Sequence, residues 1–479
     1  MTMQRFLFNS SGPRCTDGTP AGYFLQLAHA SSPHKDSWVV WLEGGGICQS
    51  NADCFTRSQS GIGSSNYWAE TMTGEQLSSS DCTANPDFCQ WNHVWVPYCS
   101  GDIWVGQAST FSNPWAELDA RGLGDNLLPF GGGRAVSAAE RARLNDTAHT
   151  FVFEGHLIVQ TISRLLAAQS PREVLLTGCS AGGIGTFENI DYLASALPGV
   201  RVSGNPQAGW FGLPISDYAH VTADRPDPDP YHLRESSWLL HANAYRHPPY
   251  ERCVATRGAA FNVTCLSPPY FYPYLQTAIF VSENTLDSYQ FYVQGLAPRG
   301  DVTPKVIQYA RFLHAMLAGS LTKSILDGGG KQAHDGLFSP ACLAHCLRFS
   351  GAGAPTVRGV AHYEALGNWY FGRAGKPFRL LDNSTDQKQL LSCADDDDGS
   401  GRDGRRPGDA PAVDLPFMPP AVEEAAAARD DLHVDPPGCQ DKAFGECGAG
   451  IVPGQTVVCC PGNGVCKPAQ PGAPTVCVL

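Results

Sequence analysis

The sequence has no long hydrophobic run, no basic stripe and, over residues 1–393, no internal repeat. No apolar segment among the 479 residues approaches the roughly 18 to 20 residues that a membrane-spanning helix needs, which excludes such a helix. Lysine and arginine are scattered, which argues against binding to nucleic acid or to an anionic membrane surface. Because 43% of the residues are hydrophobic, we expect a globular protein with a sizeable core and two to three domains.

Cysteine, by contrast, is abundant. The chain has 18 cysteines and four N-x-S/T sequons, at Asn9, Asn145, Asn262 and Asn383. Together they favour an oxidising, secretory compartment, where disulfides persist and such asparagines accept glycans. Residues 1–10 show neither the apolar core nor the cleavage pattern of a signal peptide, so secretion is inferred from composition.

Negative charge is concentrated toward the C-terminal end. Residues 394–438 carry 12 acidic against 4 basic side chains and account for −8 of the net charge of −13. The segment is also rich in glycine, proline and alanine, so we expect an acidic, disordered linker. It separates a main domain, residues 1–393, from a short C-terminal block.

The C-terminal block, residues 439–479, is dense in cysteine. Its six cysteines are Cys439, Cys447, Cys459, Cys460, Cys466 and Cys477. So short a piece has too little core to fold unaided, and we expect a disulfide-stapled module with the cysteine order of knottin-like and hevein-like modules. Its connectivity is open, and so is its role, which is either carbohydrate contact or stability alone. Because the block has no C-x-x-C pair and no histidine, a zinc site is not expected there.

Strand and helix patterns in residues 1–393 predict an α/β fold. Residues 38–42 and 174–176 are apolar runs typical of buried strands, whereas residues 151–168 place apolar side chains at helical spacing. Helix, strand, glycine-rich turn and helix in succession indicate a mainly parallel sheet flanked by helices.

The glycine-rich turn G-C-S-A-G-G at residues 178–183 makes Ser180 a candidate nucleophile. In a G-x-S-x-G turn between a strand and a helix, the serine oxygen is exposed above the sheet and the next backbone N–H faces the same space. The flanking glycines let the strand and the helix approach closely. The alternative is an ordinary glycine-rich turn, and the choice depends on whether an acid and a histidine follow in that order.

A candidate base lies downstream of this turn. His345 stands between Cys342 and Cys346, and a disulfide from either cysteine would pin its loop. A buried structural histidine is the alternative interpretation. His334 and His362 are the reserves.

Asp287 is the strongest candidate for the orienting acid. It follows residues 277–281, which we interpret as a buried strand, and active sites assemble at the carboxyl ends of parallel strands. An equal alternative is that Asp287 caps a helix beginning at Ser288. Asp217 and Asp301 are weaker candidates, since neither follows so clear a strand.

Donors for an oxyanion are expected from a second glycine run. The strand over residues 38–42 leads into Gly44, Gly45 and Gly46, whose amides can turn toward one point as in the HGGG-type loop of lipases and esterases. The N–H of Ala181 would join them. A glycine-rich turn without a ligand is the alternative.

These motifs, in this order, resemble the pectin acetylesterase and Notum family of carboxylesterases. The resemblance runs from Cys15 to Cys346 and includes L-E-G-G-G at 42–46, N-P-D-F at 85–88, G-C-S-A-G-G at 178–183, A-G-W-F at 208–211, D-S-Y-Q at 287–290 and A-H-C at 344–346. It implies an α/β-hydrolase-like catalytic domain over residues 1–393 with Ser180 as nucleophile, Asp287 as orienting acid and His345 as base. Gly45, Gly46 and Ala181 would supply the oxyanion amides, and no metal or cofactor is implied.

Two residues depart from the family pattern. Ile47 follows the glycine run, where the family usually has an aromatic residue, and Gln207 precedes A-G-W-F, where it usually has an acid. Neither replacement removes a catalytic group, but both leave the substrate open.

The resemblance implies a secreted serine carboxylesterase of the extracellular space or cell wall. The expected substrate is an O-acetyl group on a cell-wall or matrix polysaccharide. The alternative within the family is a fatty acyl group on a protein, which Notum-like enzymes remove. A hypothesis from another class is an inactive polysaccharide-binding protein, against which the intact set of Ser180, Asp287 and His345 argues.

Overall fold

The computed structural model describes residues 2–48, 50–114, 149–211, 244–262, 264–293, 304–327, 334–351 and 354–382, and three short strands of the C-terminal block. The chain divides into two compact units, Met1–Asp396 and Asp397–Leu479. The predicted linker, residues 394–438, lies outside the described residues. The domain boundaries at residues 393 and 438 therefore stay predictions.

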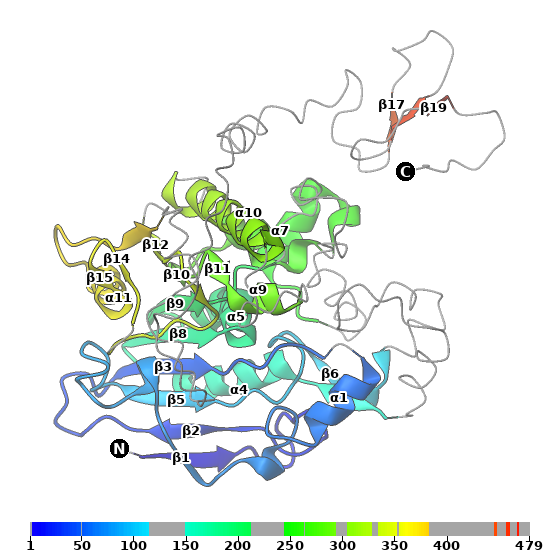
Figure 1. Cartoon of the computed structure of the whole chain (residues 1–479). Coiled ribbons are helices and arrows are strands. Elements are labelled where there is room, and N and C mark those ends of the chain that lie inside the picture. Colours follow the sequence, from blue (N-terminus) through cyan, green and yellow to red (C-terminus); the bar gives the residue numbers. More distant parts are fainter. Residues whose placement is uncertain are drawn as a thin grey trace. The chain divides into compact units, whose positions relative to one another are not determined.

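Within the described residues, a ten-stranded mixed sheet organises the first unit (Figure 1). Its strands, in spatial order, are β16 (Arg379–Leu381), β12 (Gly336–Ser339), β10 (Phe280–Ser282), β9 (Arg201–Gln207), β8 (Glu173–Cys179), β3 (Ser37–Leu42), β5 (Asn92–Val96), β2 (Gly22–Gln26), β1 (Thr2–Leu7) and β4 (Thr71–Thr73). The strands from β16 to β5 pair in parallel, and β2, β1 and β4 continue the sheet antiparallel. The prediction of a mainly parallel sheet is confirmed.

The other described α-helices and strands of the first unit lie around this sheet. They are the helices α1 (Asn51–Ser58), α4 (Gly155–Ala168), α5 (Ala181–Ala196), α7 (Pro248–Arg257), α8 (Pro268–Phe271), α9 (Ser288–Val293), α10 (Pro304–Leu321) and α11 (His362–Tyr370), and the strands β6 (Ala108–Ser112), β7 (Phe151–Phe153), β11 (Leu286–Asp287), β13 (Leu343–Ala344), β14 (Thr356–Val357) and β15 (Val360–Ala361). No helix within the described ranges has the length and apolar character needed to cross a membrane.

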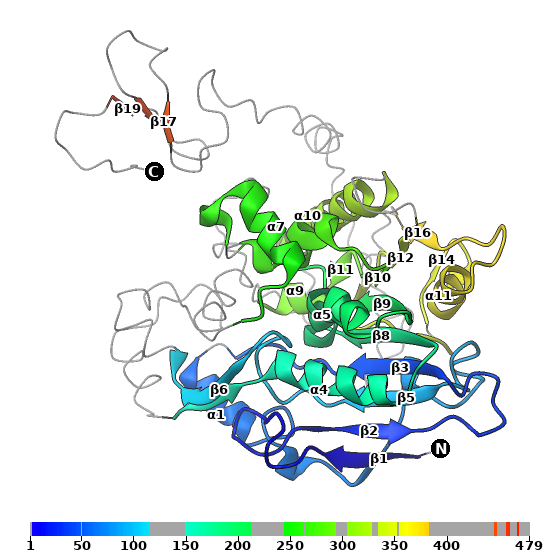
Figure 2. The ribbon, with the colours of Figure 1, turned by 180° about the vertical axis from the view of Figure 1, so that it is seen from behind.

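The sheet separates two hydrophobic cores. Because successive side chains of a strand point to opposite faces, Trp38 and Val40 of β3 join a core with α4 and α5, whereas Val39 and Trp41 join a second core with α11. Figure 2 shows α4 in front of β3 and β5 when the molecule is seen from behind. Both faces of β3 and β8 are buried, which explains why these strands appear as continuous apolar runs.

The helix predicted over residues 151–168 is wrong at its start. Residues 151–153 form β7, which pairs antiparallel with β6, and α4 begins only at Gly155. The edge of β6 offers these three apolar residues backbone partners and burial, which outweigh their helical spacing. Similarly, the strand predicted over residues 277–281 is β10, which begins at Phe280 and extends to Ser282.

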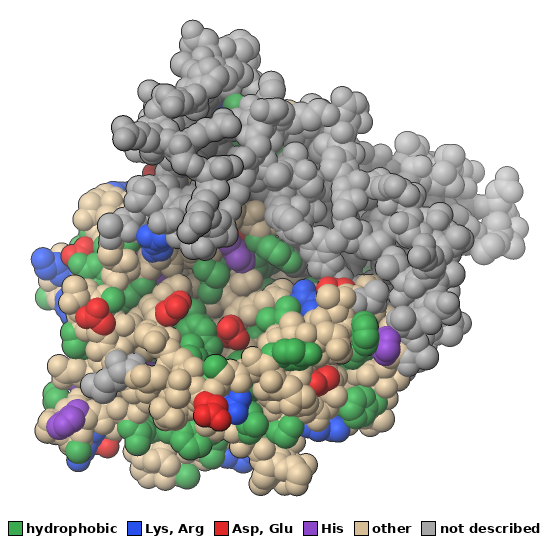
Figure 3. All heavy atoms as spheres, turned by 60° about the horizontal axis from the view of Figure 1, so that its bottom comes forward, with side chains coloured by type: hydrophobic (Ala, Val, Ile, Leu, Met, Phe, Trp, Pro, Cys, Tyr) green, Lys and Arg blue, Asp and Glu red, His purple; other side chains and the backbone are tan. Residues whose placement is uncertain are grey.

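Five disulfides join pairs of described cysteines. They are Cys15–Cys99, Cys48–Cys54, Cys82–Cys89, Cys179–Cys346 and Cys253–Cys265. These bonds fit the oxidising compartment expected from the composition. On the face drawn in Figure 3, acidic and basic side chains are interspersed among apolar ones, consistent with the scattered charge of the sequence.

In the second unit, the described residues form a three-stranded antiparallel sheet. Its strands are β17 (Gly445–Cys447), β18 (Val457–Cys459) and β19 (Lys467–Pro468), with β18 in the middle. Two of the six cysteines of the block, Cys447 and Cys459, lie in these strands. The disulfide-stapled module stays a prediction.

Candidate active site

Ser180 occupies the elbow between a buried strand and a helix. β8 ends at Cys179 and α5 begins at Ala181, and Ser180 between them has φ 61° and ψ −125°. Its N–H donates to the carbonyl of Gln207 at 3.0 Å, and its side chain makes no helix-capping hydrogen bond. A non-glycine residue in such a conformation costs about 1–3 kcal/mol, and strain of this kind is typical of functional sites.

The glycines of the elbow are required by close backbone approach. A Cβ at Gly182 would lie 1.9 Å from the carbonyl oxygen of Leu42, and one at Gly178 would lie 2.4 Å from the same oxygen. A Cβ at Gly183 would lie 2.0 Å from the carbonyl oxygen of Gln207. The expectation that these glycines let helix and strands approach closely is confirmed, because any side chain there would push α5 away from β3 and β9.

Asp287 and His345 are brought together by two short parallel strands. β11 pairs with β13 so that Asp287 lies opposite Ala344, and His345 follows directly. The imidazole Nδ1 of His345 donates to both carboxylate oxygens of Asp287, at 2.9 and 3.0 Å. The side-chain amide of Asn284 donates to the carbonyls of Ala344 and His345, at 2.8 and 3.1 Å. Hydrogen bonds therefore fix both the imidazole of His345, through Asp287, and its backbone carbonyl, through Asn284.

Asp287 makes the contacts that both interpretations call for. The fully buried carboxylate accepts the N–H groups of Tyr289 and Gln290, at 2.7 and 3.2 Å, and so caps α9, which begins at Ser288. It also accepts from His345. A carboxylate has enough acceptor sites for both tasks, and the cap fixes the orientation that the imidazole needs.

A disulfide ties the candidate base to the elbow. Cys179, directly before Ser180, is bonded to Cys346, directly after His345, with the two Cα atoms 5.9 Å apart. The sequence predicted a disulfide from Cys342 or Cys346 but not this partner. The signal lay in two cysteines that each adjoin a candidate catalytic residue. Nε2 of His345, the nitrogen that would take the serine proton, has no hydrogen-bond partner among the described residues.

The glycine loop after β3 is anchored through its carbonyl oxygens. The guanidinium of Arg57 donates to the carbonyl of Gly45, and the Tyr98 hydroxyl donates to that of Gly46 at 2.8 Å. Because the C=O and N–H of one peptide point in opposite directions, the N–H of Gly46 points away from Arg57. Sequence reasoning missed Arg57, because nothing in its local sequence indicates a contact with this loop.

The loop also lies beside the elbow. A Cβ at Gly44 would lie 3.0 Å from the Cβ of Ser180. No described backbone carbonyl accepts a hydrogen bond from the N–H of Gly45 or Gly46. Ala181 is the first residue of α5, so its N–H has no partner within the helix. The N–H groups of Gly45, Gly46 and Ala181, which are the three predicted oxyanion donors, therefore lie near Ser180 without a hydrogen bond to a described backbone carbonyl.

Glu43 connects this loop to the sheet. Its carboxylate accepts the N–H of Tyr98 at 2.9 Å, and its backbone carbonyl accepts from the indole of Trp104 at 3.2 Å. Burial raises the pKa of Glu43 to about 7, against the smaller, opposite effect of the Tyr98 N–H. Glu43 is therefore protonated in the folded protein at pH values where it is ionised in the unfolded chain.

We expect this pKa shift to make stability depend on pH. The proton on Glu43 stabilises the fold fully below its ordinary pKa of 4.5, and this contribution is lost as the pH rises through about 7. At about 1.4 kcal/mol for each pKa unit, the loss is on the order of 3 kcal/mol. Denaturant unfolding of the wild type and of Glu43→Gln between pH 4 and 8 measures it. If the stability difference between the two proteins does not change with pH, the assignment to Glu43 is wrong.

The reserve candidates do not reach Asp287. His362 is fully buried with its Nε2 2.7 Å from the hydroxyl of Ser282, and burial lowers its pKa to about 3, as for a neutral core histidine. His334 is exposed. Asp217 and Asp301 lie outside the described residues. Of the three histidines considered, the structure pairs only His345 with Asp287.

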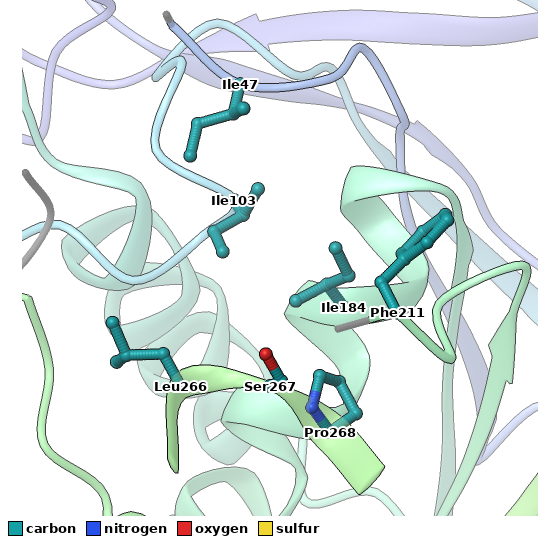
Figure 4. Close-up of a pocket in the computed structure, with 7 residues that line it drawn as sticks. All are labelled: Ile47, Ile103, Ile184, Phe211, Leu266, Ser267 and Pro268. Atoms are coloured by element: carbon teal, nitrogen blue, oxygen red, sulfur yellow. The ribbon is translucent and has the colours of Figure 1, made fainter. Parts of the chain in front are cut away.

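A small apolar cavity adjoins these groups (Figure 4). It is lined by Ile47, Ile103, Ile184, Phe211, Leu266, Ser267 and Pro268. Ile184 is one helical turn beyond Ser180, and the ring of Phe211 is 6.0 Å from that of His345. The cavity volume is about 20 Å³, room for roughly one water-sized group.

The two departures from the family pattern have different places. Ile47 enters the cavity from the side opposite Leu266 and Ser267, so it forms part of the pocket wall (Figure 4). Gln207 is buried at the end of β9, where its amide donates to the side chains of Asn205 and Thr177. Of these two residues, Ile47 lines the cavity next to the candidate nucleophile and Gln207 does not. Within the described parts of the chain, no cluster of three or more His, Cys, Asp or Glu side chains is placed to hold a metal ion.

A mainly parallel sheet flanked by helices, with a serine elbow after a central strand, defines an α/β-hydrolase-like protein. The chain matches the Pectinacetylesterase family model over residues 3–123 and 137–391, and it belongs to that family. It is 26% identical to pectin acetylesterase 5 of Arabidopsis thaliana, over 78% of this chain and 80% of that protein. It is also 26% identical to the palmitoleoyl-protein carboxylesterase notum1 of Xenopus laevis, over 77% of this chain and 67% of that protein. The resemblance is confirmed, and the family is one of carboxylesterases.

Proposed function

We propose that the chain is a secreted serine carboxylesterase with Ser180 as nucleophile, His345 as general base and Asp287 as orienting acid. The observation that carries this proposal is the hydrogen bond between Asp287 and His345, together with the disulfide that joins Cys346, next to His345, to Cys179, next to Ser180. Nε2 of His345, which has no hydrogen-bond partner among the described residues, and the strained backbone of Ser180 support it.

The proposed reaction proceeds through an acyl-enzyme. Ser180 Oγ attacks the ester carbonyl carbon while its proton passes to Nε2 of His345, and Asp287 stabilises the imidazolium through Nδ1. The N–H groups of Gly45, Gly46 and Ala181 stabilise the oxyanion. The alcohol leaves with the proton from His345. A water molecule, activated by the same nitrogen, then releases the acid and restores the hydroxyl of Ser180.

For the substrate we propose an O-acetyl group on a polysaccharide. The small cavity beside the elbow fits an acetyl methyl, and a relative named as a pectin acetylesterase supports the polysaccharide. Removal of a fatty acyl group from a protein is the second candidate, supported by the relatives named as palmitoleoyl-protein carboxylesterases. It would require a much deeper apolar cavity in this place. The disulfides of the described residues favour secretion, and contact of residues 439–479 with carbohydrate stays a further proposal.

The chain-length preference tests this function. With aryl esters from acetyl to palmitoyl, we expect kcat/KM to be highest for acetyl and to fall about tenfold for each of the first added methylenes, because the cavity walls must move. Ile47→Ala should raise kcat/KM for the butyryl ester about tenfold. Leu165→Ala, an exposed position on α4, is the matched control and should change nothing. A wild type that prefers octanoyl or longer esters would instead establish the fatty acyl alternative.

A further inference from the structure

A second carboxyl group lies against Asp287. Glu283 follows β10 and is fully buried. Its Oε2 accepts the N–H of Trp210 at 2.8 Å, and the N–H of Gly209 also donates to the carboxyl. Its other oxygen, Oε1, receives no hydrogen bond from the described residues, although the carboxyl is in hydrogen-bond contact with Asp287.

Two touching carboxyl groups in a dry interior cannot both be ionised, so one must hold a proton. Asp287 accepts three donors, which are the N–H groups of Tyr289 and Gln290 and the imidazole of His345. These donors stabilise its negative charge. Oε1 of Glu283 has no donor, and it becomes satisfied only if it carries the proton and donates to Asp287.

The electrostatic surroundings agree with this placement. Burial, and after it the charge of Asp287, raise the pKa of Glu283 well above its ordinary range. Among the described residues, Asp287 is the charged group that acts on Glu283 from its own loop, and His345, which directly follows β13, lies beyond Asp287. Of the described residues that follow β9, Gly209 and Trp210 contribute backbone N–H groups. A neutral carboxylic acid keeps a carbonyl oxygen, which can still accept these N–H groups.

We propose that Glu283 is a protonated positioning residue, which donates a hydrogen bond from Oε1 to Asp287 and so holds the carboxylate in line with His345. This inference rests on the proposed catalytic roles of Asp287 and His345. The neutral acid leaves a single negative charge beneath the imidazole. Loss of its proton at alkaline pH would set two negative charges against each other and turn Asp287 away from Nδ1 of His345.

The geometry calls for one acceptor and one donor at this position, which selects the test variants. Glu283→Gln supplies both, since its carbonyl can accept from Trp210 and its amide can donate to Asp287, and it cannot ionise. Glu283→Met has a similar size but supplies neither group. Thermal unfolding of both variants shows whether each is folded before its activity is compared.

The pH profile of kcat/KM separates positioning from a merely structural role. We expect a decline on the alkaline side in the wild type and no such decline in Glu283→Gln, which should keep activity within about fivefold of the wild type at neutral pH. Glu283→Met should lose about 10- to 100-fold in kcat with little change in KM, the usual effect of removing a group that orients a ligand or base. An alkaline decline that is the same in Glu283→Gln and wild type overturns the proposal.

An infrared measurement tests the proton itself and does not depend on ester hydrolysis. The difference spectrum between the wild type and Glu283→Gln at neutral pH should contain the C=O stretching band of a buried carboxylic acid, whereas the protonated Glu43 contributes equally to both proteins and cancels. If the band is absent from the difference spectrum of the two folded proteins, the proposal fails whatever the activity. If the band is present but Ser180→Ala remains active, the proposed function fails while the protonated state of Glu283 stands.

Discussion

Ser180→Ala is expected to lower kcat for ester hydrolysis on the order of 10⁴-fold or more, with little effect on the fold. The hydroxyl is the group that would form the bond to the acyl carbon, and no other side chain at the elbow can replace it. The cavity and the oxyanion amides remain in the variant, so substrate binding should persist while turnover is lost. Steady-state kinetics with an aryl acetate, after subtraction of spontaneous hydrolysis, measure the effect.

A second serine, at the far end of helix α5, provides the control for this substitution. Ser195 lies on the same helix, is exposed, and its hydroxyl donates to the carbonyl of Tyr192 three residues earlier. Ser195→Ala should therefore keep wild-type kcat and KM. If Ser180→Ala retains more than about a tenth of the wild-type rate, the nucleophile is assigned to the wrong residue. An inactive wild type that binds polysaccharide would favour the binding-protein hypothesis.

Removal of the Cys179–Cys346 disulfide is expected to impair both stability and turnover. The bond joins residues 167 positions apart, so its loss should lower the free energy of unfolding by about 2–5 kcal/mol. Because it also ties the segment of His345 to the elbow, kcat should fall even well below the unfolding temperature. The double variant Cys179→Ala, Cys346→Ala avoids leaving an unpaired thiol beside the site.

The Cys82–Cys89 disulfide offers a matched control. It closes a loop of only 7 residues in sequence and includes no residue of the candidate site. Its removal by the corresponding double alanine variant should cost less stability, because a shorter loop constrains the unfolded chain less, and should leave kcat unchanged. Equal losses of kcat in both double variants would show that the Cys179–Cys346 bond has no particular role in placing the base. Denaturant unfolding and single-temperature kinetics distinguish these outcomes.

The elbow and the central strands could be predicted because their signals are local. The glycines around Ser180 are fixed by contacts with adjacent strands, and the buried strands β3 and β8 are continuous apolar runs. Residues 151–153 could not be assigned in this way, because their strand exists only through pairing with β6. The local sequence pattern favoured a helix at these residues, but pairing with β6 makes them a strand.

The site was predictable only to the extent that it uses known motifs. The sequence singled out Asp287 and His345, which form a hydrogen bond in the structure, yet it could not decide between cap and acid, since a single carboxylate makes both sets of contacts. Arg57 and Glu283 were missed, because each acts through a contact that forms only in the folded chain, Arg57 with the carbonyl of Gly45 and Glu283 with the carboxylate of Asp287. Such supporting groups emerge only when the chain is folded.

The link between Cys179 and Cys346 also has a consequence for the biosynthesis of the protein. In a newly made chain with reduced thiols, the loop of His345 would not yet be linked to the elbow. Under the proposed function, such a chain would hydrolyse esters slowly, and its turnover would rise once the bond is oxidised. Production in a reducing cytoplasm would correspondingly give a protein of low specific activity, recoverable by oxidative refolding.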